Sequence, residues 1–309
     1  MMDVSAIVVS FNSEGRIGHA VEAHEEALSH LKAEVIVVDN ASADSSVTEA
    51  RAALRRGHVI ANPENVGYGK AANQGIVAAQ GRTCLILNDD ARLKPGAIDQ
   101  MLAVLDESDD IALVGPRIVD QADDPMPSAR WTFPGPAEEG ERLANIVKEV
   151  DRNSWYPVKQ THPTEVSWLV GACILGKTEI LRATGGFNPA FFLYSEDIDL
   201  CRRLHELGYR IITVPGATCV HTGSVSTGVA YGNEVSIRRR AESRDIYYRI
   251  WHTRPVRSLI HLRRSIGLTN QPGRLKHHLP QVLWDGPSLH DLRVLAPLAI
   301  SPIGKTNGG

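Results

Sequence analysis

One stretch of the sequence joins a buried strand to a cluster of polar side chains. Leu85-Ile86-Leu87 is an apolar run that stops abruptly at Asn88, Asp89 and Asp90. Strands buried in a parallel sheet are near-continuous apolar runs, and ligands of open α/β sheets bind beyond the carboxyl ends of such strands. Acidic groups there can hold a divalent cation, which in turn can hold a diphosphate. The alternative is a solvated turn, since Asn and Asp favour turns.

Two earlier apolar runs end in the same way, one in Ser10 and the other in Asp39 and Asn40. Helix-like segments follow each run, and Ser13 is the expected N-cap of the first helix. This alternation predicts βαβ units and a parallel sheet whose strand ends share one edge. Three polar strand ends on one edge favour a ligand site over three separate turns. The predicted strands of this part are residues 4–10, 34–40, 58–60, 83–87 and 111–114.

A second acidic cluster follows a block of aromatic residues. Ser195 is the expected N-cap of a helix whose first turn carries Glu196, Asp197 and Asp199. Acidic residues favour the helix dipole, which alone could explain them. Glu196 and Asp199 also share one face, with which Arg202 and Arg203 can pair at i+3 or i+4. Asp197 has no such local partner, so it is a candidate for lining a pocket.

Two further segments carry candidate ligands. Residues 166–175 predict a strand interrupted by Gly171, and a glycine there marks a bulge or a close backbone approach. Trp168 is either a platform for sugar stacking or part of the core. Two short strands are expected between residues 211 and 221, and His221 ends the second. This histidine is either a satisfied structural residue or, beside a carboxylate-bound cation, an additional ligand.

Composition and missing motifs exclude several classes. A net charge of −3 over 309 residues argues against a nucleic-acid-binding surface. The first strand is followed by neither a P-loop nor a Gly-x-Gly-x-x-Gly motif. The cysteines lack metal-ligand spacing and are expected to be buried free thiols. With no basic leader and no apolar run of membrane-spanning length, the protein is expected in the cytoplasm or on the inner face of the plasma membrane.

Eight short motifs then occur in a specific order. They are Val8-Val9-Ser10-Phe11-Asn12-Ser13, Val37-Val38-Asp39-Asn40-Ala41-Ser42, Asn65-Val66-Gly67-Tyr68-Gly69 with Asn73 and Gly75, Leu87-Asn88-Asp89-Asp90, Trp168-x-x-Gly171-Ala172, Gly185-Gly186-Phe187, Phe192-x-Tyr194-x-Glu196-Asp197-x-Asp199-Leu200, and His221 near Gly223. Over roughly residues 4–225 the chain resembles the inverting, nucleotide-sugar-dependent glycosyltransferases of family 2, and most of all their rhamnosyltransferase branch.

The resemblance implies an α/β GT-A fold, which is a Rossmann-like, mostly parallel sheet with helices on both faces. Residues 1–230 would form the catalytic domain. Residues 231–309 lie outside the core of the resemblance, and their composition predicts a basic helical C-terminal extension with a disordered end. Within the proline-rich residues 116–166, a short helix is expected at about 138–150.

The resemblance also implies site roles. Asp90 would bind Mg²⁺ or Mn²⁺ directly, with Asn88 as a weaker ligand and His221 completing the shell. Asn88 is a departure from the strict Asp-x-Asp motif of the family. Asp197 would be the catalytic base, and Asp39 would accept the imide N–H of uracil or thymine, which favours a UDP- or dTDP-sugar donor. The remaining residues expected at the nucleotide-sugar are Ser10, Phe11, Asn12, Asn65, Gly67, Asn73, Asn88, Asp89, Trp168, Gly171 and Glu196.

The expected reaction moves a sugar, with rhamnose favoured, to a hydroxyl of a lipid-linked or saccharide acceptor in cell-wall or polysaccharide synthesis. A nucleotidyltransferase is the first alternative, but it would need a Gly-rich basic loop after the first strand. A non-catalytic sugar- or membrane-binding relative is the second, and the presence of Asp39, Asp90 and Asp197 together argues against it.

The C-terminal extension is strongly basic. Between Val235 and Arg264 the sequence has nine Arg against one Glu and one Asp, with Ile246, Tyr247, Ile250 and Trp251 at helical spacing. A basic amphipathic helix of this kind can lie on an anionic membrane. It can equally pack on the catalytic domain with a solvated basic face, and the two interpretations are compatible.

Overall fold

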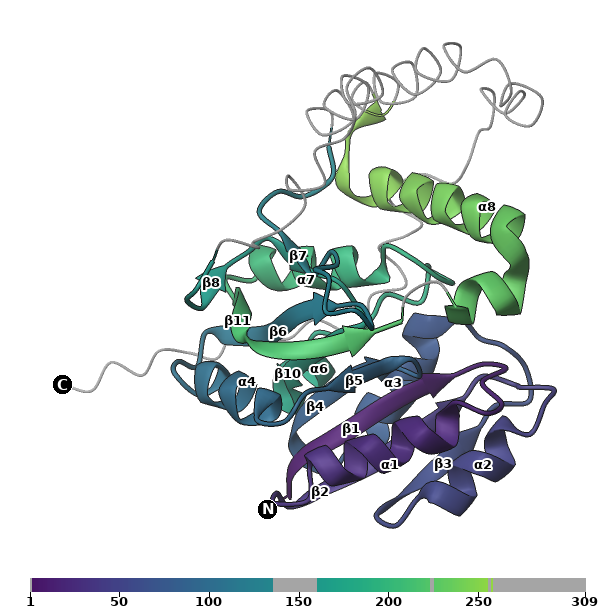
Figure 1. The fold of residues 1–309 in the computed structure, drawn as a ribbon. Coiled ribbons are helices and arrows are strands. Elements are labelled where there is room, and N and C mark those ends of the chain that lie inside the picture. Colours follow the sequence, from purple (N-terminus) through teal and green to yellow (C-terminus); the bar gives the residue numbers. More distant parts are fainter. Residues whose placement is uncertain (1, 136–159, 223–224, 255–256, 258–309) are drawn as a thin grey trace.

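The computed structural model describes residues 2–135, 160–222, 225–254 and 257, and the side chains of 225–233 are outside this description (Figure 1). The predicted helix at 138–150 and the end of the chain beyond residue 257 therefore lie outside the described residues.

The N-terminal half alternates strands and helices as predicted. Its elements are β1 (Met2–Ser10), α1 (Ile17–Ala27), β2 (Ala33–Asp39), α2 (Ser46–Ala53), β3 (Gly57–Ala61), α3 (Tyr68–Ala78), β4 (Gly81–Asn88), β5 (Ala91–Leu93) and α4 (Ala97–Leu105). The elements of the second half are β6 (Ile111–Val119), β7 (Ala129–Arg130), β8 (Thr164–Glu165), β9 (Trp168–Leu169), β10 (Cys173–Lys177), α6 (Thr178–Ala183), α7 (Glu196–Glu206), β11 (Arg210–His221) and α8 (Val225–Trp251).

The central sheet is mostly parallel. Its strand order is β3-β2-β1-β4-β10-β6-β11-β5, and β8 pairs with β11. Strands β1 to β4 are parallel neighbours, and β6 and β11 are parallel to each other. The exceptions are β10, which lies antiparallel between β4 and β6, and the short strands β5 and β8, which both pair antiparallel with β11. The prediction of a common edge concerns the strands up to residue 114 and does not cover β10, whose N-terminal end meets the C-terminal end of β4.

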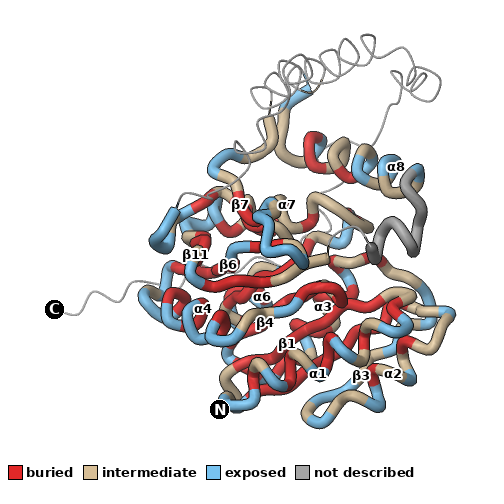
Figure 2. Tube along the Cα trace, in the orientation of Figure 1, coloured by how far each residue is buried: buried red, intermediate tan, exposed pale blue. Residues whose placement is uncertain are grey.

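Helices cover both faces of the sheet, as the resemblance implies. Alternate residues of each strand point to opposite faces. Val8 and Val37 belong to the same hydrophobic cluster as residues of α1, α2 and α4, whereas Ile7 and Ile36 lie in a cluster with residues of α3, α6 and α7. The central strands are buried along almost their whole length (Figure 2). The cysteines Cys84, Cys173, Cys201 and Cys219 are buried free thiols, as predicted.

Three local predictions are wrong, and in each case a long-range contact replaces the local pattern. α1 begins at Ile17 and Ser13 does not cap it, because the Ser13 hydroxyl donates to Asp89. Residues 166–175 form two strands, β9 and β10, in different sheets. The two strands expected between residues 211 and 221 are one strand, β11, which pairs with β6 across a register shift between Val214 and Thr218.

α8 packs on α7 and thereby on the catalytic domain. Tyr247 and Tyr248 are buried against Phe191. The indole N–H of Trp251 donates to Asp199 Oδ1 at 2.9 Å. The predicted pair of Asp199 with Arg203 forms at Oδ2, where the Arg203 Nε–H donates at 2.8 Å. The predicted domain boundary after residue 230 falls within α8. Among the described residues, none of the helices combines the length and hydropathy required to cross a bilayer.

The packing of α3 against β1 generates a stability prediction. A Cβ at Gly75 would lie 2.4 Å from Ile7 Cγ2, in a core with no room for it. Gly75→Ala should therefore lower the free energy of unfolding by about 1–3 kcal/mol, although alanine is the better helix former. Urea denaturation measures the difference.

Gly18→Ala in α1 is the matched control, because the nearest atoms to its added Cβ are 3.9 Å away. This variant should be unchanged or more stable by up to about 1 kcal/mol. Equal effects of the two substitutions would contradict the tight α3–β1 contact.

Candidate active site

The polar ends of β1, β2 and β4 lie side by side. Ser10 is the register partner of Asp39, and Val9 on the other side of β1 is the partner of Asn88. The common edge predicted from the sequence is thus confirmed for these strands. Ser10 Oγ is buried and has no hydrogen-bond partner among the described residues, so it is available to a ligand at this edge.

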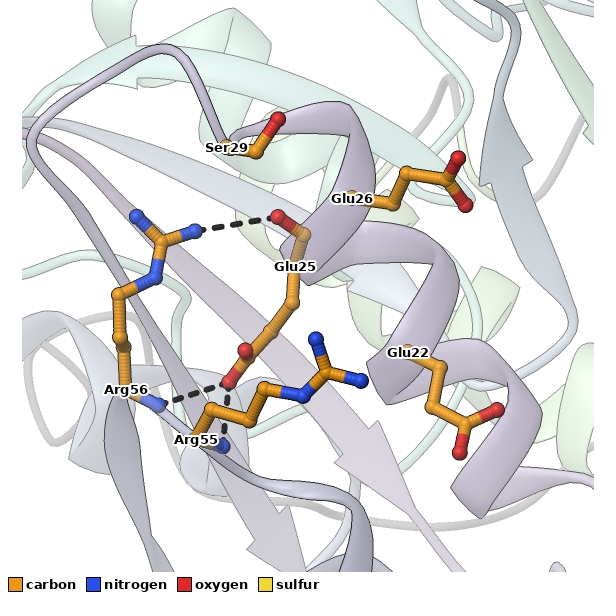
Figure 3. Close-up of a pocket in the computed structure, with 6 residues that line it drawn as sticks. All are labelled: Glu22, Glu25, Glu26, Ser29, Arg55 and Arg56. Atoms are coloured by element: carbon orange, nitrogen blue, oxygen red, sulfur yellow. Dashed lines mark hydrogen bonds between the residues drawn. The ribbon is translucent and has the colours of Figure 1, made fainter.

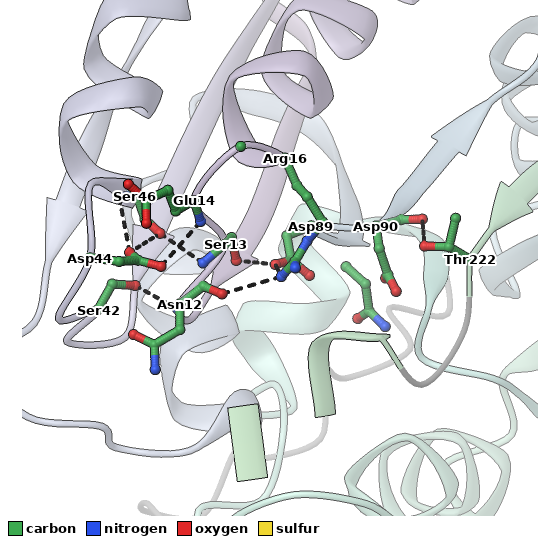
Figure 4. Close-up of polar contacts among 12 residues, drawn as sticks. Asn12, Ser13, Glu14, Arg16, Ser42, Asp44, Ser46, Asp89, Asp90 and Thr222 are labelled. Carbon is green, nitrogen blue, oxygen red and sulfur yellow. Dashed lines mark hydrogen bonds and ion pairs between the residues drawn. The ribbon is translucent and has the colours of Figure 1, made fainter. Parts of the chain in front are cut away.

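Asp39 is buried at this edge and is held in place by the residues that follow it. The Ser42 backbone N–H donates to Asp39 Oδ2 at 2.9 Å, and the Ser42 hydroxyl donates to Oδ1 at 2.5 Å. Ser42 Oγ in turn accepts the Asn12 backbone N–H at 2.8 Å, and Asn12 Oδ1 accepts the Ala43 N–H at 3.0 Å (Figure 4). An ionised carboxylate has about four acceptor sites, so Asp39 can accept further hydrogen bonds.

Asp89 points back to the loop after β1. Its Oδ2 accepts the hydroxyl of Ser13 and lies 3.5 Å from an Arg16 guanidinium nitrogen (Figure 4). The residue is only 4% exposed. Asp89 therefore joins the end of β4 to the β1–α1 loop and fixes the position of the residue beside it, Asp90.

Asp90, His221 and Asn88 come together across the sheet. Asp90 Oδ1 lies 3.1 Å from His221 Nε2, and Asn88 Nδ2 lies 3.3 Å from the same nitrogen. The antiparallel pairing of β11 with β5 brings His221 here, because its register partner is Ala91.

This donor set fits a divalent cation. Mg²⁺ is usually bound by one or two carboxylates together with waters and substrate phosphates. Within the part of the chain that the structure describes, no group of three or more His, Cys, Asp and Glu side chains is arranged so that it could hold a metal ion by itself. A cation at Asp90 and His221 would accordingly need phosphate oxygens of a bound ligand to complete its shell.

Asp197 lies in the first turn of α7 and is half-buried. Its Oδ2 accepts the Gly171 backbone N–H at 2.9 Å and its Oδ1 accepts the Ile198 N–H at 2.8 Å. The predicted capping by Ser195 is wrong: its φ is +65°, and its side chain makes no cap hydrogen bond.

The turn between β9 and β10 connects Asp197 to the end of β4. The Gly171 carbonyl accepts the Tyr68 hydroxyl at 3.0 Å, and the Ala172 carbonyl accepts the Asn88 N–H at 3.1 Å. A Cβ on Gly171 would lie 3.3 Å from Asp197 Cβ, which confirms the predicted close backbone approach. The predicted base and the segment that carries the predicted cation ligands are thus joined by hydrogen bonds to one turn.

Burial changes the titration of three groups here. It raises the pKa of Asp197, although the N–H donors of Gly171 and Ile198 act in the opposite direction. Burial and the charge of Asp197 raise the pKa of Glu196 to about 8. The pKa of Tyr68 is raised by burial and by the charges of Glu196 and Asp197. Glu196 and Tyr68 are therefore neutral at pH 7.

Several predicted binding residues have defined structural contacts. Asn65 Oδ1 accepts the Gly67 N–H at 3.0 Å and the Asn40 amide at 2.9 Å. Gly67 has φ +89°, and a Cβ there would lie 2.5 Å from the Phe192 carbonyl oxygen, so the position requires glycine. The Asn73 amide bonds the backbone N–H and C=O of Phe187 at 2.8 and 2.7 Å.

Two aromatic candidates occupy different environments. Trp168 is 9% exposed, belongs to the core and donates its indole N–H to the Thr132 carbonyl at 3.1 Å. Phe11 is half-buried beside the end of β1. Ser42 and Tyr68 had no predicted role at the site, although both contact predicted site residues. The role of Ser42 could have been predicted from the sequence, because an aspartate such as Asp39 commonly accepts a backbone N–H a few residues later in a turn.

A cavity of about 610 Å³ is located elsewhere. It is lined by residues from the second half of α1 and from the chain entering β3 (Figure 3). Glu25 accepts the backbone N–H groups of Arg55 and Arg56 there, at 2.6 and 2.8 Å. Because these segments adjoin the N-terminal ends of the strands, the cavity lies at the opposite edge from Asp39 and Asp90.

The geometry agrees with comparisons to known proteins. The family model described as Glycosyl transferase family 2 matches residues 5–183. The N-acetylglucosaminyl-diphospho-decaprenol L-rhamnosyltransferase of Mycobacterium tuberculosis is 30% identical over 63% of this chain and 68% of its own. The low-salt glycan biosynthesis hexosyltransferase Agl10 of Haloferax volcanii is 25% identical over 72% and 68%.

Solved structures show the same fold. The mannosyltransferase PcManGT of Pyrobaculum calidifontis, in complex with GDP-Man and Mn²⁺, has a TM-score of 0.50 at 17% identity, covering 87% of this chain and 83% of its own. GalNAc-T7 with UDP, GalNAc and Mn²⁺ has a TM-score of 0.52 at 14% identity, covering 72% of this chain, which spans 44% of that protein. The chain belongs to glycosyl transferase family 2, and within it the protein is a glycosyltransferase of the rhamnosyltransferase-like kind.

The neutral state of Glu196 generates a stability prediction. Its pKa is about 8 in the folded protein against an ordinary 4.5, so the folded state keeps a proton that the unfolded state releases. The contribution of Glu196 is complete below about pH 4 and is lost as the pH rises towards 8. Glu196→Gln should remove this loss and be more stable than wild type by roughly 3 kcal/mol at pH 7–8. Urea denaturation at pH 5, 7 and 8 measures the effect.

Glu206→Gln, at the exposed end of the same helix, is the control and should retain the pH dependence of the wild type. Parallel stability curves for wild type and Glu196→Gln would show that Glu196 is ionised in the folded protein.

Proposed function

We propose that the protein is an inverting, metal-assisted glycosyltransferase acting on a dTDP- or UDP-sugar. The sugar, for which the rhamnosyltransferase similarity favours rhamnose, goes to a hydroxyl of a lipid-linked or saccharide acceptor in cell-wall or polysaccharide synthesis. The observation that carries this proposal is the turn at Gly171-Ala172, which bonds Asp197 on one side and the Asn88 backbone, beside Asp90 and His221, on the other.

The donor is proposed to lie across the carboxyl ends of β1, β2 and β4. Asp39 accepts the imide N–H of the pyrimidine ring, a donor that cytosine lacks. Ser10, Phe11, Asn12 and Asn65 flank the nucleoside. Asp90 and His221, with Asn88 as a weaker ligand, would hold Mg²⁺ or Mn²⁺, and the ion would supply positive charge that stabilises the departing diphosphate.

Asp197 is proposed to remove the proton from the acceptor hydroxyl as its oxygen attacks the anomeric carbon. The new C–O bond forms on the face opposite the breaking bond to diphosphate, so one displacement inverts the anomeric centre. The raised pKa of Asp197 makes it a stronger base than an exposed aspartate. The neutral Glu196 leaves the negative charge of this pair on Asp197.

We further infer that the enzyme works in the cytoplasm at the inner face of the plasma membrane. The catalytic domain would be residues 1–230, and the basic extension from residue 231 would contact anionic lipid. The exposed side chain of Arg238 on α8 supports this inference.

Asp197→Asn tests the proposed base. The substitution preserves size but removes the proton acceptor, so kcat should fall by about 10²–10⁴-fold while the affinity for donor is retained. In the wild type, kcat/KM should rise with pH through the raised pKa of Asp197, because only the ionised carboxylate acts. Release of nucleoside diphosphate from dTDP- and UDP-sugars with Mn²⁺ is the measurement.

The control is Glu206→Gln, which changes an exposed carboxylate of the same helix and should leave kcat unchanged. Near-wild-type turnover by Asp197→Asn would assign the base to another residue.

Asp90→Asn tests the cation site without requiring turnover. Mutation of a residue that hydrogen-bonds to a metal ligand commonly lowers metal affinity by about 10–100-fold, and mutation of a direct ligand should lower it at least as much. Calorimetric titration of UDP or dTDP should show strong Mn²⁺ dependence for wild type and for the exposed control Asp109→Asn, but little for Asp90→Asn. An unchanged Mn²⁺ dependence in Asp90→Asn would place the cation elsewhere.

A further inference from the structure

The loop that precedes Asp197 is held in place by α8. Ser243 Oγ donates to the Leu193 carbonyl at 2.6 Å, and Tyr247 and Tyr248 pack on Phe191. The loop has two consecutive residues in the left-handed region, Tyr194 at φ +71° and Ser195 at φ +65°. Such conformations cost roughly 1–3 kcal/mol each for residues other than glycine, and they persist where surrounding contacts enforce them.

Two arginines of α8 lie on the aromatic rings of this loop. The Arg239 guanidinium carbon is 4.5 Å from the centroid of the Phe192 ring, and that of Arg240 is 4.6 Å from the Tyr194 ring. Cation–π contact fixes a guanidinium through its face, so its in-plane N–H donors stay available for a ligand.

The charges of these arginines are poorly compensated. Arg239 shares Glu242 with Arg238, at 3.2 and 3.6 Å, and Arg239 Nε is buried with no hydrogen-bond partner among the described residues. Arg240 is exposed and forms no ion pair with the described part of the chain.

We propose that Arg239 and Arg240 form a subsite for the phosphate of an acceptor whose sugar is joined to a lipid through a diphosphate. This inference rests on the proposed function, since the acceptor hydroxyl must reach Asp197 and the arginines sit on the loop that leads directly to it. In a sugar diphosphate acceptor, the phosphate is one sugar ring away from the attacking hydroxyl. Paired guanidinium groups match phosphate oxygens with bidentate hydrogen bonds. The diphosphate of the donor is assigned to the cation at Asp90 and His221, so the arginines serve the acceptor.

The test compares two soluble probes: a short-chain alkyl diphosphate of N-acetylglucosamine, and a neutral alkyl N-acetylglucosaminide of the same chain length. Calorimetry gives the affinity of each, in the presence of Mn²⁺ and UDP or dTDP. The wild type should bind the diphosphate probe more tightly than the neutral one. R239Q/R240Q should lose about 10- to 100-fold in affinity for the diphosphate probe, and R240Q alone should lose part of this. Both should bind the neutral probe as the wild type does.

R238Q is the matched control, because it removes a neighbouring arginine of α8 that contacts neither ring, and it should bind both probes normally. R239K/R240K retains charge without the planar fork and should recover part of the lost affinity. Mn²⁺-dependent binding of UDP or dTDP should stay unchanged in every arginine variant, and loss of the cation–π contacts should lower the melting temperature by no more than a few degrees.

Several results would overturn the inference. These are equal wild-type affinity for the two probes, equal losses on both probes in R239Q/R240Q, or a parallel loss of nucleotide binding. A defect of R239Q/R240Q confined to phosphatidylglycerol vesicles, with unchanged binding of the diphosphate probe, would also overturn it by assigning the arginines to the membrane. Failure of the proposed function is a separate result, namely a wild type that neither binds UDP or dTDP with Mn²⁺ nor transfers sugar.

Discussion

The site depends on the hydrogen bonds of one short turn, Gly171-Ala172. Its Gly171 N–H orients Asp197, its Gly171 carbonyl holds Tyr68, and its Ala172 carbonyl binds the backbone of Asn88. These bonds join three segments that are far apart in the sequence. The turn exists because β10 runs antiparallel between β4 and β6, so the chain entering β10 passes over the carboxyl end of β4.

Electrostatics within the site follow from where each carboxyl group is buried. The carboxylate of Asp89 bonds to Ser13 and lies near Arg16, and that of Asp199 bonds to Arg203 and Trp251. Both carboxylates are thus engaged in structural contacts. Asp90 lies against His221, and Asp39 against Ser42. Glu196 has a neutral side chain, because burial beside Asp197 raises its pKa to about 8. Of the pair Glu196 and Asp197, the negative charge therefore lies on Asp197, the residue that the proposed mechanism uses as the base.

α8 confirms one of the two interpretations that the sequence allowed for a basic amphipathic segment, which is packing on the domain with a solvated basic face. Tyr247 and Tyr248 pack on the domain, whereas Arg238 and Arg249 are exposed to solvent. Contact of this basic face with a membrane remains a proposal. Ser243, Tyr247 and Tyr248 of α8 contact the loop before Asp197, so the helix supports the segment that carries the proposed base.

The sequence by itself determined the alternation of strands and helices, the buried free cysteines, the polar ends of β1, β2 and β4, and the family. These features can be predicted because they depend on short-range patterns, namely runs of apolar residues and the spacing of a few motifs. Ser13, Ser195 and Trp168 show the limit of such patterns. Local rules predicted that both serines cap helices and left the role of Trp168 open. In the structure Ser13 donates to Asp89, Ser195 has a left-handed backbone conformation without a cap hydrogen bond, and Trp168 packs in the core.

Only the tertiary structure decided that His221 lies beside Asn88, 133 residues away, and that Gly171 approaches Asp197. The physical reason is that both contacts need strands to return antiparallel to their neighbours, β11 along β5 and β10 along β4. No local pattern specifies that pairing, and no local pattern reports how deeply a carboxyl group such as Glu196 is buried. Strand pairing and burial, and with them the titration of the site, are properties of the folded chain.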